Sequence, residues 1–418
     1  MLNQSYDEIA HLQVAGFGDN MGDLHEFYIT EDDTALVAIY HPIPWDLTSM
    51  GGIEDGWLMD SSFQELDIET GDLIFEWNAT DHVGVNETYV SLAPDDDFGR
   101  SAELAWDWFH INSVMKDENG DYIISGRTMS CVYKISGEDG HIIWRLHGKR
   151  SDFEFESSDA EFHFQHDARW LNEKQTRMTV WDNGDPQADV SVSRGLLLDI
   201  DQDARTASLV QDFTNENRTF GEFMGSVQAI DASNETTNFM LGFGSEPYFA
   251  EVDRDDNVLL SVQLAQSDVT SYRIYKQQWQ GKPSTDPDMF WNGSHVYLSW
   301  NGATDVETWE VYTGANETSD MNSWTRIASA RRTGFETTID IADVDNMDTY
   351  VRGKALNSDG DELGRTKVSG DGEPNQRSST DDDGEESGGD ESGAASMADG
   401  RTAGMYFSVL LVVGSVLI

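Results

Sequence analysis

The stretch AWDWFHINSVMKDENGDYIISGR, residues 105–127, contains the pattern that decides the fold. An apolar run begins after His110, a polar turn follows at Asn119 and Gly120, and a second apolar run ends at Arg127. An Asn-Gly pair between two such runs is typical of a β-hairpin. Similar turn signals recur through most of the chain and long helical periodicity is absent, so the sequence predicts an all-β protein.

The same unit of strand, turn and strand is repeated along the chain. Further copies are HEFYITEDDTALVAIY from His25, HDARWLNEKQTRMTVWDNG from His166 and SVQAIDASNETTNFMLGFG from Ser226. A second repeat pairs ELDIETGDLIFEW (65–77) with KISGEDGHIIWRL (134–146). The copies at 110, 166 and 226 start 56 and 60 residues apart, which suits one propeller blade each. The pattern therefore predicts a β-propeller over residues 1–280, with about four and a half blades and further blades expected upstream.

The chain after Pro283 has a different pattern. HVYLSWNGATDVETWEVYTG and DTYVRGKALNSDGDELGRTKV alternate strictly between apolar and polar residues, joined by FETTIDI. This predicts a small β-sandwich at 284–370 that resembles a fibronectin type III domain. Residues 371–403 form an acidic Ser/Gly-rich segment, for which a disordered linker is expected, and 404–418 are apolar.

Composition excludes some partners. The chain has 78 acidic and 26 basic residues and a formal net charge of −52, so a nucleic-acid partner, which requires basic patches, is not expected. A halophilic protein would have a similar charge. Cys131 is the one cysteine, so the chain cannot form an internal disulfide, and we expect a buried core thiol.

Several features indicate an extracellular protein attached to a membrane. The small residues 392–395, a spacer and the apolar tail 404–418 have the layout of a GPI-attachment signal, with a single-pass tail anchor as the alternative. The start of the chain has no signal-peptide pattern, which is a further reason to expect upstream sequence. Candidate N-glycosylation sites are Asn3, Asn78, Asn86, Asn217, Asn234, Asn292 and Asn316.

Three histidines share one position of the repeat. His25, His110 and His166 each stand at the start of a unit, and equivalent positions of a propeller face the same region around the channel. Asn112 lies two residues beyond His110 on the same strand face, and Arg127 ends the next strand. A tris-His metal site is one interpretation. Arg127 favours another, a site for an anionic group, because guanidinium binds oxyanions and repels a dication.

These motifs resemble the arylsulfotransferase family, especially its fungal-type branch. The resemblance rests on DLHEFYITEDDTALV, WDWFHINSVMKDENGDYIISGR, VYKISGEDGHIIWRLHGKRSDF and FHFQHDARW, and it covers most of residues 5–265. It implies a six-bladed propeller that moves a sulfuryl group from a phenolic sulfate ester to a phenol through a sulfohistidine. By this resemblance His166 is the sulfated residue, His110, Asn112 and Arg127 hold the sulfuryl group, and His25 is the remaining catalytic histidine.

The residues suit this chemistry. A neutral imidazole is a usable nucleophile, and fixed donors from Arg127, His25 and Asn112 would stabilise charge on the transferred group. A phenol acceptor needs a base, for which His110 is the first candidate. The nearby aromatic residues Trp106, Trp108 and Phe109 either stack on the aryl substrate or belong to the blade core. No cofactor or metal is expected for this function.

Two other functions stay open at this point: a His-ligated metal-dependent enzyme, and a non-catalytic cell-surface binding or adhesion propeller. We expect His163 to be structural and HGKR (147–150) to be a turn.

Overall fold

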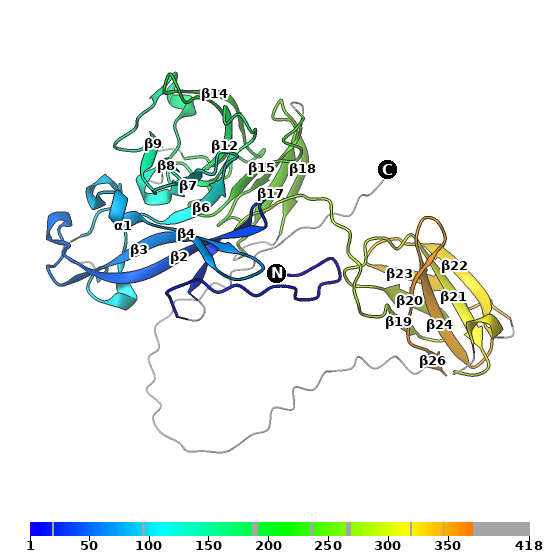
Figure 1. Ribbon diagram of the computed structural model, residues 1–418. Coiled ribbons are helices and arrows are strands. Elements are labelled where there is room, and N and C mark those ends of the chain that lie inside the picture. The colour runs from blue at the N-terminus through cyan, green and yellow to red at the C-terminus, as the bar shows by residue number, and fades with distance from the viewer. Residues whose placement is uncertain are drawn as a thin grey trace, which may run out of the picture. The chain divides into compact units, whose positions relative to one another are not determined.

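The computed structural model describes residues 1–18, 21–93, 97–185, 191–234, 237–264, 269–317, 320–345 and 347–370. The predicted acidic linker at 371–403 and the apolar tail at 404–418 lie outside these residues. The described chain divides into two compact units, residues 11–277 and residues 1–10 with 278–370. Both units are built from β-strands (Figure 1).

The first unit contains four meandering sheets in its described residues. The first sheet has the order β1-β2-β3-β4, and β5 pairs with β3 in parallel. Its strands are β1 (Gly22–Ile29), β2 (Thr34–Trp45), β3 (Gly56–Asp67), β4 (Leu73–Asn78) and β5 (Trp106–Asp107). The second sheet comprises β6 (Ile111–Lys116), β7 (Tyr122–Gly126), β8 (Cys131–Ile135) and β9 (Ile142–His147).

The third and fourth sheets continue this arrangement. The third, with the order β10-β14-β13-β12-β11, comprises β10 (Glu154–Phe155), β11 (His166–Trp170), β12 (Arg177–Asp182), β13 (Arg194–Asp201) and β14 (Thr206–Phe213). The fourth comprises β15 (Ser226–Ala229), β16 (Phe239–Gly242), β17 (Tyr248–Val252) and β18 (Val258–Gln263). The four sheets follow one another as blades (Figure 1).

The predicted repeat is confirmed by these sheets. The units from His25, His110, His166 and Ser226 form the first two strands of the four sheets, and the repeats at 65–77 and 134–146 form the hairpins β3–β4 and β8–β9. Residues 274–276 run beside β15, where the backbone N–H of Ile274 donates to Ser226 Oγ at 2.9 Å. The fold is a β-propeller with fewer described blades than the six that the resemblance implies.

Apolar side chains fill the spaces between successive blades. Trp77, Trp108 and Tyr133 belong to the cluster shared by the first two sheets, and Trp144 and Trp170 belong to the next cluster. Cys131 is buried in the first cluster, as expected for a core thiol. The only α-helix in the described residues is the single turn α1 (Ala79–His82), and no helix there is long and apolar enough to span a membrane.

The described residues of the second unit form two sheets around one core. One sheet has the order β19-β20-β23 and the other β22-β21-β24-β25, with β26 beside β24. The strands are β19 (Asp288–Trp291), β20 (His295–Ser299), β21 (Thr308–Gly314), β22 (Thr325–Arg331), β23 (Glu336–Asp340), β24 (Tyr350–Leu356), β25 (Glu362–Arg365) and β26 (Ser369–Gly370). Trp309 and Val311 lie in the core between them. Its relation to fibronectin type III domains stays a prediction.

The first ten residues belong to this second unit. The Tyr6 hydroxyl donates to the carbonyl of Gly302 at 2.8 Å, and the Tyr6 ring lies 6.1 Å from the Trp279 ring. The structure therefore groups these residues with the sandwich, whereas the sequence prediction assigned residues 1–280 to the propeller.

Candidate active site

The three repeat histidines come together where the first strands of the blades meet. His25 lies on β1, His110 directly precedes β6, and His166 begins β11. The rings of His25 and His110 are 4.6 Å apart, and the Tyr272 ring lies 5.3 Å from His25 and 6.4 Å from His166. Equivalent repeat positions thus bring side chains separated by 141 residues of sequence to one place.

His166 is held in one tautomer. The side-chain amide of Asn183 donates to the carbonyls of Gly221 and Met224 at 2.7 and 2.8 Å, so its oxygen must face His166. That oxygen lies 2.7 Å from Nδ1 of His166, which must therefore carry the proton. The backbone N–H of Met224 donates to Nε2 at 3.2 Å. The reactive lone pair of the imidazole is consequently on Nε2.

The surroundings of His166 keep it neutral. The side chain is 2% exposed. Burial is the main cause that lowers the pKa of His166 well below its usual value, and the charges of Arg127 and His110 lower it further, against the hydrogen bond with Asn183. A buried, uncharged imidazole with its lone pair on a defined nitrogen is the form that attacks an electrophile.

His25 and His110 each have a carboxylate behind the ring. Nδ1 of His25 pairs with Asp23, and Nδ1 of His110 lies 2.5 Å from Asp107 Oδ2. Burial lowers the pKa of His25, although the hydrogen bond to Asp23 opposes this shift. A carboxylate on Nδ1 orients the imidazole and leaves Nε2 for exchange of a proton with a substrate.

Arg127 supplies a half-buried positive charge with a spare donor. It begins the 3₁₀ turn Arg127–Met129, and its terminal nitrogen donates to the carbonyl of Glu222 at 3.2 Å. Its guanidinium lies 5.4 Å from the centre of the Phe164 ring. Within the described chain the buried Nε has no partner, and burial lowers the pKa of the guanidinium. An oxyanion would satisfy such a donor.

Asn112 is fully buried and holds the segment that leads into His166. Its side-chain N–H donates to the carbonyl of Gln165 at 2.8 Å. Gln165 in turn donates from its own amide to Ser125 Oγ and to the carbonyls of Gly126 and Cys131. Asn112 Oδ1 has no partner among the described residues. The predicted contact of Asn112 with a sulfuryl group stays a prediction beside this positioning contact.

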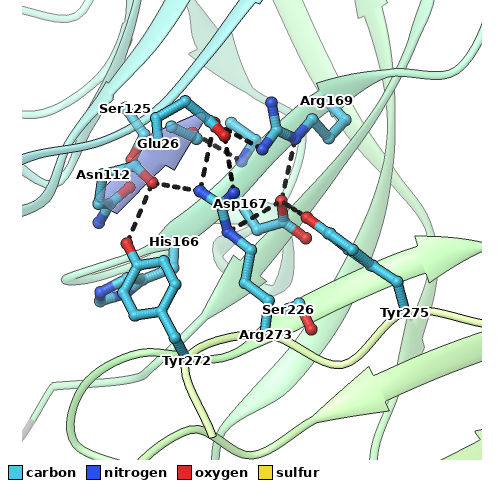
Figure 2. Close-up of polar contacts among 12 residues, drawn as sticks. Glu26, Asn112, Ser125, His166, Asp167, Arg169, Ser226, Tyr272, Arg273 and Tyr275 are labelled. Carbon is cyan, nitrogen blue, oxygen red and sulfur yellow. Dashed lines mark hydrogen bonds and ion pairs between the residues drawn. The ribbon is translucent and has the colours of Figure 1, made fainter. Parts of the chain in front are cut away.

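A buried ion-pair network lies beside the histidines, and the sequence analysis did not predict it (Figure 2). Glu26 is 1% exposed and pairs with Arg169 at 2.7 Å and Arg273 at 2.8 Å. Asp167 pairs with Arg169 at 2.9 Å and accepts a hydrogen bond from the Tyr275 hydroxyl at 2.6 Å. Figure 2 shows these groups converging from three separate parts of the chain.

Arg273 also ties the segment 272–276 to the first two blades, because its guanidinium donates to the carbonyls of His25 and Asn112 at 2.9 and 2.5 Å. The only sequence signal for this network is an acidic residue directly after each of two repeat histidines, Glu26 after His25 and Asp167 after His166.

Of the two roles open for the aromatic residues before His110, the structure contradicts aryl stacking and supports the blade core. Trp108 and Phe109 are 0% exposed and Trp106 is 3% exposed, all within the cluster between the first two blades. They leave no surface on which a substrate ring could stack. The aromatic rings beside the histidines are instead Tyr40, 5.0 Å from His25 and 5.5 Å from His110, and Tyr272.

The three histidines do not form a metal-holding group. In the described part of the chain, one group of three ligand-bearing side chains has its donor atoms close enough to share an ion, and it contains none of His25, His110 and His166. The described residues therefore give no support to the tris-His interpretation, and they place the half-buried Arg127 beside the histidines.

A comparison with family models decides the family. The model for arylsulfotransferase (ASST) matches residues 1–265, more than half of the chain. The chain belongs to the arylsulfotransferase family. This membership supports a sulfotransferase-like function in general, with an aryl sulfate donor and a phenol acceptor as the family's general substrates. The fungal-type branch stays a prediction.

Solved structures similar to this arylsulfotransferase-family chain have low identity and include a β-propeller domain and two proteins named as enzymes. A putative 6-phosphogluconolactonase from Bacteroides uniformis has 10% identity, covers 89% of this chain and 92% of its own, and gives a TM-score of 0.36. The Cps50 (Swd1) β-propeller domain of Myceliophteria thermophila has 9% identity over 80% and 87%, with a TM-score of 0.29. A streptogramin B lyase has 8% identity over 83% of each chain, with a TM-score of 0.28. No curated protein matches the sequence.

Proposed function

We propose that this chain transfers a sulfuryl group from a phenolic sulfate ester to a phenolic acceptor through a sulfohistidine at His166. The observation that carries the proposal is the state of His166. The imidazole is buried and neutral, and Asn183 Oδ1 accepts a hydrogen bond from Nδ1–H, so the lone pair is on Nε2. Family membership supports the general class of reaction.

In the first half-reaction, Nε2 of His166 attacks the sulfur of the donor. The N–S bond forms while the bond between sulfur and the aryl oxygen breaks, and that electron pair leaves with the aryl oxygen. Protonated His110 gives its proton to the departing oxygen, with Asp107 orienting the ring from Nδ1. In the second half-reaction the acceptor oxygen attacks the same sulfur, the N–S bond breaks, and the acceptor proton passes to His110.

Fixed donors stabilise the negative charge on the sulfuryl oxygens during both steps. Arg127 offers its unpaired Nε, and His25 borders the same space. The N–H of Met224, which contacts Nε2 in the resting site, loses that acceptor once the N–S bond forms and becomes available to a sulfuryl oxygen. Such donors are effective because burial lowers the local dielectric and the protein holds them in place.

The test is incubation of the full chain with an aryl sulfate donor alone, followed by intact-mass analysis. The wild-type protein should gain the mass of one SO₃ group, and addition of a phenol should remove it. His166→Ala should show neither the adduct nor turnover. His141→Ala, a change at a 63% exposed histidine on the β8–β9 turn, is the matched control and should behave as wild type.

Normal turnover by His166→Ala would refute the mechanism. A folded wild-type protein that forms no adduct and turns over no donor would favour the binding-module alternative. Turnover that depends on added metal and leaves no adduct would favour the metal-enzyme alternative.

The proposed location is the cell surface, with membrane attachment through the tail 404–418 by a GPI anchor or a tail anchor. Exposed asparagines at five of the candidate glycosylation sites support passage through the secretory pathway, namely Asn86, Asn217, Asn234, Asn292 and Asn316. Asn3 and Asn78 are half-buried. Mass spectrometry of the mature C-terminus tests this: an intact Ile418 would refute GPI processing, and a protein without glycans would refute the secretory route.

A further inference from the structure

A second cluster of potential metal ligands lies at the joint between the second and third blades, shortly before His166 in the chain. His147 ends β9 in the second blade, and Glu161 and His163 precede β11 in the third. One donor atom from each of the three side chains lies within 4.8 Å of the other two, and all three side chains are half-buried. None of these atoms takes part in the proposed transfer of the sulfuryl group.

The ring of His147 is oriented by contacts outside the cluster. Nδ1 of His147 lies 2.9 Å from the carbonyl of Ser130, which leaves Nε2 with its lone pair for a ligand. The His147 ring packs between Phe155 and Phe162, at 5.3 and 5.0 Å. A hydrogen bond from one ring nitrogen to a carbonyl is the usual way in which a metal-binding imidazole is oriented.

The other two ligands are also fixed through their backbone. The N–H of His163 donates to Asp182 Oδ1 at 2.9 Å, and the carbonyl of Glu161 accepts a hydrogen bond from Arg194 at 3.2 Å. Arg194 itself pairs with Asp182 at 3.0 Å, so the two anchors are joined. The backbone at Glu161 and His163 is therefore tied to β12 and β13.

The backbone at His147 is in a costly conformation. Its φ is +68°, in the left-handed region, which for a residue other than glycine costs about 1–2 kcal/mol. Gly148, directly after it, has φ of +79° and accepts this conformation without penalty. Such strain is retained where the surrounding structure or a ligand requires the side chain at that place.

We propose that His147, Glu161 and His163 bind one Zn²⁺ ion, with water completing a tetrahedral site. Two imidazoles and one carboxylate are a ligand set that zinc accepts, and a half-buried site leaves the fourth position open to water. The ion would connect the end of β9 to the segment that carries Phe164, whose ring faces Arg127, and Gln165, which is fixed by Asn112. Its role is structural, because it stiffens the joint between two blades beside the site.

The experiment is zinc titration of the full chain by calorimetry after the metal has been removed with a chelator. An excess of Mg²⁺ in the buffer occupies the many surface carboxylates of this acidic chain, which would otherwise bind zinc weakly. We expect one site per chain, a tetrahedral absorption spectrum when Co²⁺ replaces Zn²⁺, and a higher melting temperature with the metal bound. The absence of saturable binding, or a preference for Mg²⁺ over Zn²⁺, would overturn the proposal.

Variants identify the ligands. His163→Ala and, separately, Glu161→Gln should weaken zinc binding by at least tenfold and remove the shift in melting temperature. His141→Ala, which alters an exposed histidine outside the cluster, should leave both unchanged. Undiminished zinc binding by the folded Glu161→Gln protein would overturn the assignment even if His163→Ala failed to fold. Because the readout is binding, a failure here is distinct from a failure of sulfuryl transfer.

Discussion

Replacing Asn183 by alanine tests how the protein prepares its nucleophile. Asn183 is 0% exposed and its side chain makes three hydrogen bonds: one from Nδ1 of His166 and two to the carbonyls of Gly221 and Met224. Alanine removes all three. The Ser193 hydroxyl lies 3.1 Å from the carbonyl of Gly221 and 2.9 Å from that of Asn183, so its one hydrogen still serves these two carbonyls. The groups that lose their only hydrogen-bond partner among the described residues are His166 Nδ1–H and the carbonyl of Met224.

The magnitude follows from these two groups. Leaving a buried polar group unsatisfied costs about 1–3 kcal/mol, so Asn183→Ala should lose about 2–6 kcal/mol of the free energy of unfolding. The share that belongs to His166 Nδ1–H also sets the preference for the reactive tautomer. At about 1.4 kcal/mol per factor of ten, its loss should slow formation of the sulfohistidine by about 5- to 150-fold.

The assay is the rate of adduct formation with donor alone, followed by rapid quenching and intact mass, alongside urea unfolding. Asn215→Ala is the matched control, because Asn215 is also a buried asparagine, yet its side chain bonds only within the turn to Thr219. It should lose stability without slowing the adduct. A folded Asn183→Ala protein that forms the adduct at the wild-type rate would refute the tautomer argument, and so would an equal loss of rate in Asn215→Ala.

Three other perturbations probe the charged groups around the site. Arg127→Ala should lower kcat, measured by steady-state kinetics, by about 10²–10³, because a fixed oxyanion donor is lost while the nucleophile remains. An unchanged rate of adduct formation in this variant would contradict the prediction. Burial holds the pKa of His166 well below 6.5, so adduct formation, measured by stopped flow, should not slow as pH falls through about 6.5. The unfolded chain gains a proton at this histidine there, so the free energy of unfolding, measured by urea titration, should decline toward lower pH. Glu26→Gln should reduce the free energy of unfolding by about 3–5 kcal/mol, because it leaves buried guanidinium groups without their counter-charge, and a change below about 1 kcal/mol would show that the ion pairs are not stabilising.

The repeat histidines illustrate what the amino-acid sequence can predict. Strand, turn and strand alternate with a local period, and one copy of the pattern predicts the next, so the blades and their first strands are located by the sequence alone. The shared position of His25, His110 and His166 within the repeat was enough to predict their convergence, because a propeller maps sequence position onto place around the channel.

The buried aromatic residues show where that reasoning stops. Trp106, Trp108 and Phe109 precede His110 in the chain, and the sequence left open whether they stack on the substrate or belong to the blade core. Packing between blades decides which face of a short segment becomes buried. Here all three rings lie in the apolar cluster between the first two blades. Tyr40, from the preceding blade, and Tyr272, 162 residues after His110, supply the rings at the site instead.

By itself the sequence determined the strands, the repeat and the histidines that the repeat aligns, since all of these depend on short-range periodicity. The tertiary structure alone decided the partners: Asn183 for His166, and Arg273 for Glu26 across 247 residues. The physical reason is that hydrogen bonds and ion pairs in a buried site depend on the spatial register between blades. That register is fixed only when all the blades pack against one another, and no local pattern in the chain records it.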